Sequence, residues 1–224
     1  MPLDKNTLRL YAITDTAAIG ERSLEQAVEA AIAGGATIIQ LREKGLDEEA
    51  LTQEAIRIGR ICHRSGIPLI VNDHYRAALR AHADGVHVGI TDTPVEEIRR
   101  LAGRDFIIGA TAKTPAQALA AQAQGADYLG VGAVFPSPTK RDAIRITPAQ
   151  FREIAGSVRL PAVAIGGITA ENLPALQGIG AAGFALVSAV FAQPDITAAC
   201  RTLRSRIDAL LDVPEPCAPE RSRL

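Results

Sequence analysis

An alternation of short apolar runs with helix starts, repeated eight times, constrains the fold of this chain more than any other feature. Each run lacks polar alternation, as expected for a strand of a parallel sheet that is buried on both faces. Eight strand–helix units of about 25 residues predict an α/β protein built as a single (β/α)8 TIM barrel. The expected strands cover residues 8–13, 36–41, 69–71, 85–88, 106–109, 128–131, 162–165 and 183–187.

An open, doubly wound sheet is the alternative architecture for such a repeat. Its dinucleotide-binding form carries a glycine-rich turn after the first strand, whereas this chain has Ile13-Thr-Asp-Thr16 at that place. The repeat ends near residue 211, and a proline-rich segment follows it. We therefore expect one barrel domain over residues 1–211 and a disordered tail over residues 212–224.

Two of the expected helices begin at a capping box, in which a hydroxyl side chain precedes Glu or Gln by three residues. These boxes are Thr93–Glu96 and Thr147–Gln150, and the segments Ser23–Gln26 and Thr114–Gln117 are expected to open two further helices. The remaining helices are expected over residues 47–63, 75–83, 169–177 and 194–211. Each helix therefore follows a strand, as the barrel requires.

Composition excludes several classes of function. The chain has 224 residues, 47% of them hydrophobic, and a net charge of −1 with both signs interspersed, so we expect no nucleic-acid partner and no membrane surface as a partner. No apolar run approaches the roughly 20 residues that cross a bilayer, and no signal peptide precedes Leu8. Cys62, Cys200 and Cys217 lack the spacing of a metal or redox motif. The expectation is a soluble, cytoplasmic protein.

The active site of a TIM barrel lies at the carboxyl ends of its strands, and polar residues gather at those ends here. Gln40-Leu-Arg-Glu-Lys44 follows the second strand, Asn72-Asp73 the third, and Asp92 lies shortly after the fourth. Neighbouring strands are about 5 Å apart, so Asp73 and Asp92 suit a Mg²⁺ ion whose shell a substrate phosphate completes. The alternative is that both aspartates are ordinary turn residues. We expect His87, within the fourth strand, to be packed rather than catalytic.

Two further segments predict anion binding. The connection after the sixth strand has about 15 residues, roughly three times the usual length, and contains Ser137-Pro-Thr-Lys140; a surface excursion is the alternative. Gly166-Gly167 follows the seventh strand and Val187-Ser188 the eighth, where TIM barrels commonly bind phosphate through backbone N–H groups. The mouth of the barrel is therefore expected to hold two phosphorylated groups, one with a metal and one without.

Seven motifs together resemble the thiamine phosphate synthase family, in order and over roughly residues 8 to 205. They are Gln40–Lys44, Asn72-Asp73, residues 83–89 with Asp92, residues 125–128, Ser137–Lys140, Gly166–Ile168 and Val187-Ser188. The resemblance implies a transferase that condenses 4-amino-2-methyl-5-(diphosphomethyl)pyrimidine with 4-methyl-5-(2-phosphoethyl)thiazole. The products are thiamine phosphate and diphosphate, the displacement is dissociative, and the cofactor is Mg²⁺.

The same resemblance implies roles for individual residues. The pyrimidine diphosphate is expected to contact Gln40, Leu41, Arg42, Glu43, Lys44 and Asn72, and Mg²⁺ is expected to bind Asp73 and Asp92. Thr111 and Lys140 are expected to bind the diphosphate, and the thiazole phosphate is expected at Ser137, Pro138, Thr139, Gly167, Val187 and Ser188. Arg42, Lys44 and Lys140 are the expected catalytic residues because they stabilise the leaving diphosphate.

Four positions depart from the usual pattern of that family. Thr111 stands where a serine is common, Ser137 where a threonine is common, and Ile90-Thr91 where a Gln-Glu pair is common. Three other functions stay open at this point: a synthase-like thiazole tautomerase, a non-catalytic barrel that binds a phosphorylated metabolite, and an unrelated phosphate-binding barrel such as a sugar-phosphate epimerase or an indole-forming synthase. Asp73, Asp92 and Lys140 argue against the tautomerase, which does not use a diphosphate site.

Overall fold

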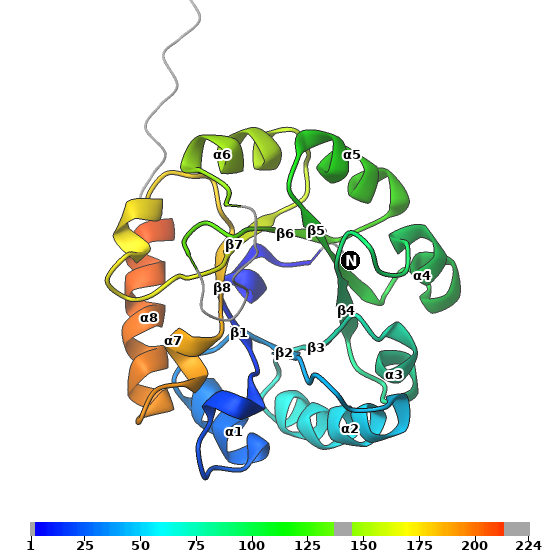
Figure 1. The fold of residues 1–224 in the computed structure, drawn as a ribbon, viewed down its shortest axis with the longest axis vertical. Helices are drawn as coiled ribbons and strands as arrows, with labels where there is room; N and C mark the ends of the chain where they lie inside the picture. Colours follow the sequence, from blue (N-terminus) through cyan, green and yellow to red (C-terminus); the bar gives the residue numbers. More distant parts are fainter. Residues whose placement is uncertain (1–2, 137–144, 213–224) are drawn as a thin grey trace, which may run out of the picture.

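The computed structural model describes residues 3–136 and 145–212, and these form a closed barrel of eight parallel strands (Figure 1). Each strand pairs with the next along the chain, and β1 pairs with β8 to close the barrel. The predicted TIM barrel is thus confirmed. The strands are β1 (Leu10–Ile13), β2 (Ile38–Leu41), β3 (Leu69–Asn72), β4 (Gly85–Val88), β5 (Ile107–Ala112), β6 (Tyr128–Gly132), β7 (Ala162–Ile165) and β8 (Gly183–Leu186).

Helices surround this barrel on its outer face (Figure 1). They are α1 (Leu24–Ala33), α2 (Glu48–Arg64), α3 (Tyr75–Arg80), α4 (Val95–Ala102), α5 (Pro115–Gln124), α6 (Pro148–Gly156), α7 (Ser188–Phe191) and α8 (Ile196–Leu211). Three 3-10 helices, η1 (Lys5–Leu8), η2 (Thr16–Ala18) and η3 (Leu173–Leu176), complete the described elements. Within the described part of the chain, no helix combines the length and the apolar character that crossing a bilayer requires.

Side chains alternate along each strand and so build two separate cores. In β1, Leu10 and Ala12 belong to the large apolar cluster between the strands and the helices. Tyr11 and Ile13 point the other way, into a smaller cluster that fills the inside of the barrel. The inner cluster also contains Tyr128. The barrel is therefore packed below its mouth, and the polar residues at the strand ends stand on a filled floor.

Three of the four expected helix starts are capped by the predicted hydroxyl residue, and the fourth is not. Ser23 and Thr147 each accept from the backbone of the third helical residue, whose glutamine side chain accepts from the cap in return. Thr114 accepts from the backbone of Gln117, but the Gln117 side chain accepts from the Lys113 N–H instead. The box expected at Thr93 was wrong, because the N-cap of α4 lies one residue later, at Pro94, and no side chain caps the helix.

The helix expected over residues 169–177 was also wrong. An α-helix starting there would need the missing N–H of Pro174 for a bond to Ala170. The chain forms only the 3-10 turn η3, and Asn172 holds the approach to it, accepting from the Thr169 N–H and donating to the Gly167 carbonyl at 2.8 Å. The predicted α-helix that does not form would therefore have followed directly after the glycine turn at β7.

Arg9 ties the start of the barrel to its last helix. Its guanidinium donates to Asp208 and to Asp212, at 2.7 Å each, although the Arg9 side chain is only 19% exposed. Asp212, the first residue of the expected tail, is the C-cap of α8, and its carboxylate pairs with Arg9, directly before β1. The expectation for residues 213–224 lies outside the described residues.

The close approach of strands at the closure predicts which glycines are irreplaceable. A Cβ on Gly183, at the start of β8, would lie 1.7 Å from the backbone carbonyl oxygen of Leu8. Gly183→Ala should therefore cost about 1–3 kcal/mol of unfolding free energy and lower the melting temperature by several degrees.

Gly156→Ala is the matched control, because a Cβ there meets nothing within 4 Å at the end of α6. The free energy of unfolding of that variant should lie within about 1 kcal/mol of the parent value or slightly above it, and its melting temperature should change little. Equal melting temperatures for the two variants would contradict the packing described for the closure. Calorimetry at one pH is sufficient for the comparison.

Candidate active site

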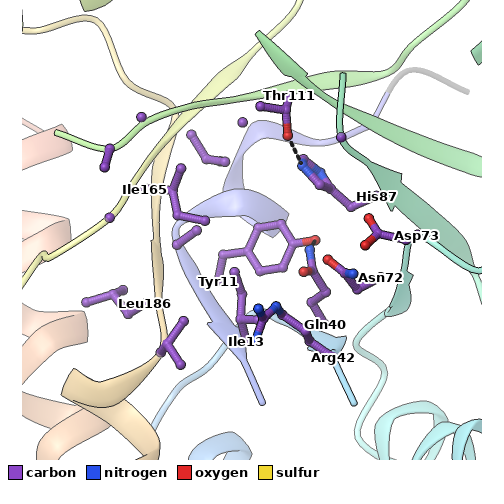
Figure 2. Close-up of a pocket in the computed structure, with 18 of the residues that line it drawn as sticks. Tyr11, Ile13, Gln40, Arg42, Asn72, Asp73, His87, Thr111, Ile165 and Leu186 are labelled. Atoms are coloured by element: carbon purple, nitrogen blue, oxygen red, sulfur yellow. Dashed lines mark hydrogen bonds between the residues drawn. The ribbon is translucent and has the colours of Figure 1, made fainter. Parts of the chain in front are cut away.

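A cavity of about 500 Å³ opens at the carboxyl ends of the strands, and all eight strands contribute to its wall (Figure 2). One residue from each strand suffices to trace the wall: Tyr11, Gln40, Asn72, His87, Thr111, Gly130, Ile165 and Ala185. Tyr11 lies at the centre of the view, with Gln40 and Asn72 beside it and Ile165 and Leu186 on the far side (Figure 2). Polar side chains therefore gather at β2 to β5 and apolar ones at β7 and β8.

Most of the residues expected from the sequence line this cavity. They are Gln40, Arg42, Lys44, Asn72, Asp73, Asp92, Thr111, Gly167, Val187 and Ser188. Leu41 is fully buried in the core between strands and helices, and Glu43 is absent from the cavity wall. Ser137, Pro138, Thr139 and Lys140 lie outside the described residues. The cavity therefore unites ten of the expected positions, contributed by six strands and the turns that follow them.

The turn after β2 is held by hydroxyl groups from the turn after β1. The Arg42 backbone N–H donates to Thr14 Oγ1 at 2.9 Å, and Glu43 accepts from Thr14 at 3.3 Å and from Thr16 at 2.6 Å. Burial raises the pKa of Glu43, and these two hydroxyl groups act against that rise. Glu43 thus fixes the turn that presents Arg42. Sequence reasoning missed Thr14 and Thr16, although their place directly after a strand was a usable signal.

Asp73 and Asp92 come together at the ends of β3 and β4. Asp73 adopts a left-handed backbone conformation with φ of 60°, and Asp92 Oδ2 accepts from the Gly89 N–H at 2.7 Å. Burial raises the pKa of Asp73 to about 6, and a hydrogen bond to Asp92 and its negative charge add to the rise. Two carboxylates forced together in this way suit a divalent cation.

A metal at this place would take only part of its shell from the protein. Among the described residues, no group of three or more His, Cys, Asp and Glu side chains could hold an ion. Two carboxylate ligands leave room for substrate oxygens and water, which is how Mg²⁺ is commonly bound beside a phosphate. The aspartate pair therefore fits Mg²⁺ better than an ion that requires a complete cage of side chains.

Lys113 and His87 are two wall residues that sequence reasoning missed or undervalued. Lys113 follows Thr111 by two residues and lines the same cavity, so the period of a strand could have identified it. His87 was expected to be packed rather than catalytic; its ring lies against Tyr128, and it also lines the cavity, where it contacts Thr111 at 3.2 Å. The cations of the described wall are thus Arg42, Lys44 and Lys113.

The opposite wall contains a turn of bare backbone between apolar side chains. Gly166 and Gly167 have φ of 100° and 64°, and a Cβ on Gly167 would lie 2.2 Å from the Pro136 carbonyl oxygen. Only glycine fits both the conformation and the space. Val187 and Ser188, at the start of the short helix α7, complete this side of the cavity.

Comparison with known proteins agrees with this geometry. The family described as thiamine monophosphate synthase matches residues 10–190. The chain belongs to this family. A thiamine-phosphate synthase of Chloroflexus aurantiacus is 46% identical over 200 residues, which cover 89% of this chain and 92% of that protein. One from Clostridium botulinum is 41% identical over 201 residues, covering 90% and 94%.

A solved structure extends the similarity to three dimensions. The thiamine phosphate pyrophosphorylase from Pyrococcus furiosus superposes with a TM-score of 0.85 at 35% identity, covering 92% of this chain and 98% of that one. The expectation of a thiamine phosphate synthase, and hence of a transferase, is confirmed. The roles of individual residues stay predictions.

The aspartate pair predicts how stability depends on pH. The folded pKa of Asp73, about 6, lies above the ordinary value of about 3.9, so the folded protein binds more protons than the unfolded chain between these values. Without divalent cations, the contribution of Asp73 to stability should therefore fall as pH rises from about 4 to 6 and stay low above that.

Asp73→Asn removes this titration and supplies the comparison. In chelator, the variant should gain in melting temperature relative to the parent as pH rises through the same window, and added Mg²⁺ should reduce the gain. A difference in melting temperature that is the same at all pH values would show that Asp73 is not perturbed by its surroundings.

Proposed function

We propose that the cavity condenses the pyrimidine diphosphate with the thiazole phosphate by a dissociative displacement, with the diphosphate at β2 to β5. The observation that carries this assignment is the division of the wall. Asp73, Asp92 and three cations lie on one side, and the side-chain-free turn Gly166-Gly167 lies on the other. Two phosphorylated substrates of different charge can then bind face to face across a packed floor.

On the first side, Arg42 and Lys44 bind the diphosphate, and Thr111 donates its hydroxyl to a diphosphate oxygen. Asp73 and Asp92 would hold Mg²⁺, which supplies charge neutralisation for the departing diphosphate when bound. We assign Lys140 to the same group as an expectation from the sequence. Lys113 adds a cation to this side that the family resemblance did not include.

The chemistry needs little from the protein beyond position and charge. The C–O bond to diphosphate breaks with its electron pair on oxygen, and the thiazole nitrogen lone pair then forms the new C–N bond. No proton has to be removed, so no strong base is required. Holding both partners in line contributes several kcal/mol of avoided entropy, and the cations stabilise the leaving group.

On the second side, Gly167, Val187 and Ser188 receive the thiazole phosphate, joined by Ser137 to Thr139 as expected from the sequence. Bare glycine backbone lets a phosphate oxygen approach N–H groups. The direct experiment mixes the purified protein, both heterocycles and Mg²⁺, and looks for thiamine phosphate and diphosphate in equal amounts. Failure to form either product would contradict the proposal.

Asp92→Asn tests the metal assignment without disturbing the turn. The amide oxygen can still accept from the Gly89 N–H, which Asp92 Oδ2 now binds at 2.7 Å, while the negative charge is lost. Turnover should fall by orders of magnitude, and the Mg²⁺ concentration for half-maximal rate should rise. Both follow from losing one of two protein carboxylates.

Asp105→Asn is the matched control, since Asp105 is exposed and precedes β5 at the other end of the barrel. This variant should keep both the rate and the Mg²⁺ requirement of the parent. Full turnover of the parent in excess chelator would contradict the metal assignment, whatever the activity of Asp92→Asn.

A further inference from the structure

A chain of hydrogen bonds crosses the inside of the barrel and joins the two polar ends of the first substrate site. Gln40 Nε2 donates to the Tyr11 hydroxyl at 2.8 Å, and the Tyr11 and Tyr128 hydroxyl oxygens lie 2.6 Å apart. Tyr128 contacts His87 Nδ1 at 3.1 Å, and His87 Nε2 contacts Thr111 Oγ1 at 3.2 Å. Figure 2 shows Tyr11 between Gln40 and His87, with the last of these bonds dashed.

The surroundings hold this chain in one geometry. A Cβ on Gly109 would lie 2.1 Å from the Tyr128 ring and 2.5 Å from His87 Nδ1, and a Cβ on Gly130 would lie 2.8 Å from His87 Cε1. Two glycines from β5 and β6 thus make room for two rings. Tyr11 is 1% exposed and Tyr128 is fully buried, and burial raises the pKa of both hydroxyls. Both tyrosines therefore keep their protons.

Each tyrosine has one hydroxyl hydrogen, so one choice of direction carries through the series of bonds. Gln40 Nε2 donates to Tyr11, and we therefore assign the Tyr11 hydrogen to its bond with Tyr128. Tyr128 then donates to His87 Nδ1. The same assignment places the His87 hydrogen on Nε2, which donates to Thr111 Oγ1. It leaves the Thr111 hydroxyl hydrogen available to a ligand in the cavity.

Reversing one end reverses all the others. If the Gln40 amide turned over, its oxygen would accept from Tyr11, Tyr128 would donate to Tyr11, and His87 would move its hydrogen to Nδ1. Thr111 would then donate to His87 and present only lone pairs to the cavity. The orientation of Gln40 and the donor capacity of Thr111 are therefore linked through three buried side chains.

We propose that Tyr11, Tyr128 and His87 are positioning residues that set substrate specificity by linking the amide of Gln40 to the hydroxyl of Thr111. This inference rests on the proposed function, in which Thr111 meets the diphosphate, and on the sequence expectation that Gln40 contacts the same substrate; we place Gln40 at its pyrimidine ring. In the observed direction Gln40 offers its oxygen to an N–H donor, and Thr111 offers its hydrogen to an anion. An aminopyrimidine diphosphate satisfies both ends together.

An analogue with a ring carbonyl in place of the amino group satisfies only one end at a time. It needs the Gln40 amide turned over, and the chain then withdraws the Thr111 hydrogen from the diphosphate. The loss of kcat/KM for the oxo analogue, relative to the amino substrate, should therefore exceed the loss that a single mismatched hydrogen bond produces. Tyr128→Phe, which removes only one oxygen, breaks the chain between the two ends.

The kinetic test compares kcat/KM for the amino and oxo pyrimidine diphosphates. Relative to the parent, Tyr128→Phe should lower the amino-to-oxo ratio by at least about tenfold. Tyr75→Phe is the matched control, because the Tyr75 hydroxyl accepts from Arg76 Nε outside the barrel, and its ratio should equal that of the parent. An unchanged ratio in a folded Tyr128→Phe protein overturns the proposal.

A second arm does not depend on turnover. ¹⁵N spectra of the free protein, with the His87 signals assigned by their loss in His87→Gln, should show a neutral ring with hydrogen on Nε2. A hydrogen on Nδ1, or a charged ring, overturns the proposal even if the protein makes thiamine phosphate. If no product forms but this tautomer is found and shifts in Tyr128→Phe, the proposed reaction fails and the linkage stands.

A double-mutant cycle tests whether Tyr128 affects diphosphate binding through Thr111. Diphosphate with Mg²⁺ is the probe, and its dissociation constant is measured for Tyr128→Phe, Thr111→Val and the double variant. If Tyr128 acts through Thr111, its substitution should weaken diphosphate binding in the parent but have no further effect once the hydroxyl is gone. Additive losses in binding would show that Tyr128 acts by another path and would overturn the linkage.

Discussion

The pairing of β1 with β8 is the constraint on which the other features depend. It turns a linear series of strand–helix units into a ring, and it brings every strand's carboxyl end to the same rim. Gln40 and Ser188 are far apart in the sequence, yet they line one cavity only because this pairing closes. Gly183 allows the close approach to Leu8, and Arg9 fastens the same edge to α8. The site is thus a consequence of closure.

Features that depend on interactions between residues close in the sequence could be predicted, whereas features that depend on distant residues could not. Strand order and most helices follow from local patterns, and the rule that strands end at the active site identified Asp73 and Asp92 before any geometry was known. Pro174 overrode a local pattern, because one missing N–H is enough to prevent an α-helix where the spacing favoured one. The contact between Tyr11 and Tyr128 spans 117 residues and depends on space left by Gly109 and Gly130. No local pattern predicts a contact of that kind.

The two halves of the rim differ in charge and are therefore suited to different substrates. Carboxylates and cations line the same side of the cavity at β2 to β5, and the negative charge of Asp92 adds to the cost of burying a charged Asp73. At β7 and β8 the wall consists of glycine backbone, Ser188 and apolar side chains such as Ile165 and Leu186, so an anion bound there meets no formal charge. A substrate with a dense negative charge and one with a weaker charge therefore have distinct places. The distribution of groups, rather than net charge, separates them.

The buried tyrosines show why a polar chain is kept inside an otherwise apolar barrel. Two phenylalanines would fill almost the same volume, and they would remove any need to satisfy two hydroxyls where an unpaired polar group is costly. Within the described residues every buried side-chain nitrogen and oxygen has a partner, so the chain is not a defect in packing. A fully paired network in a rigid, water-poor interior transmits the orientation of one end to the other. Packing alone does not require this arrangement, whereas a site that must recognise an N–H donor and an anion at once does.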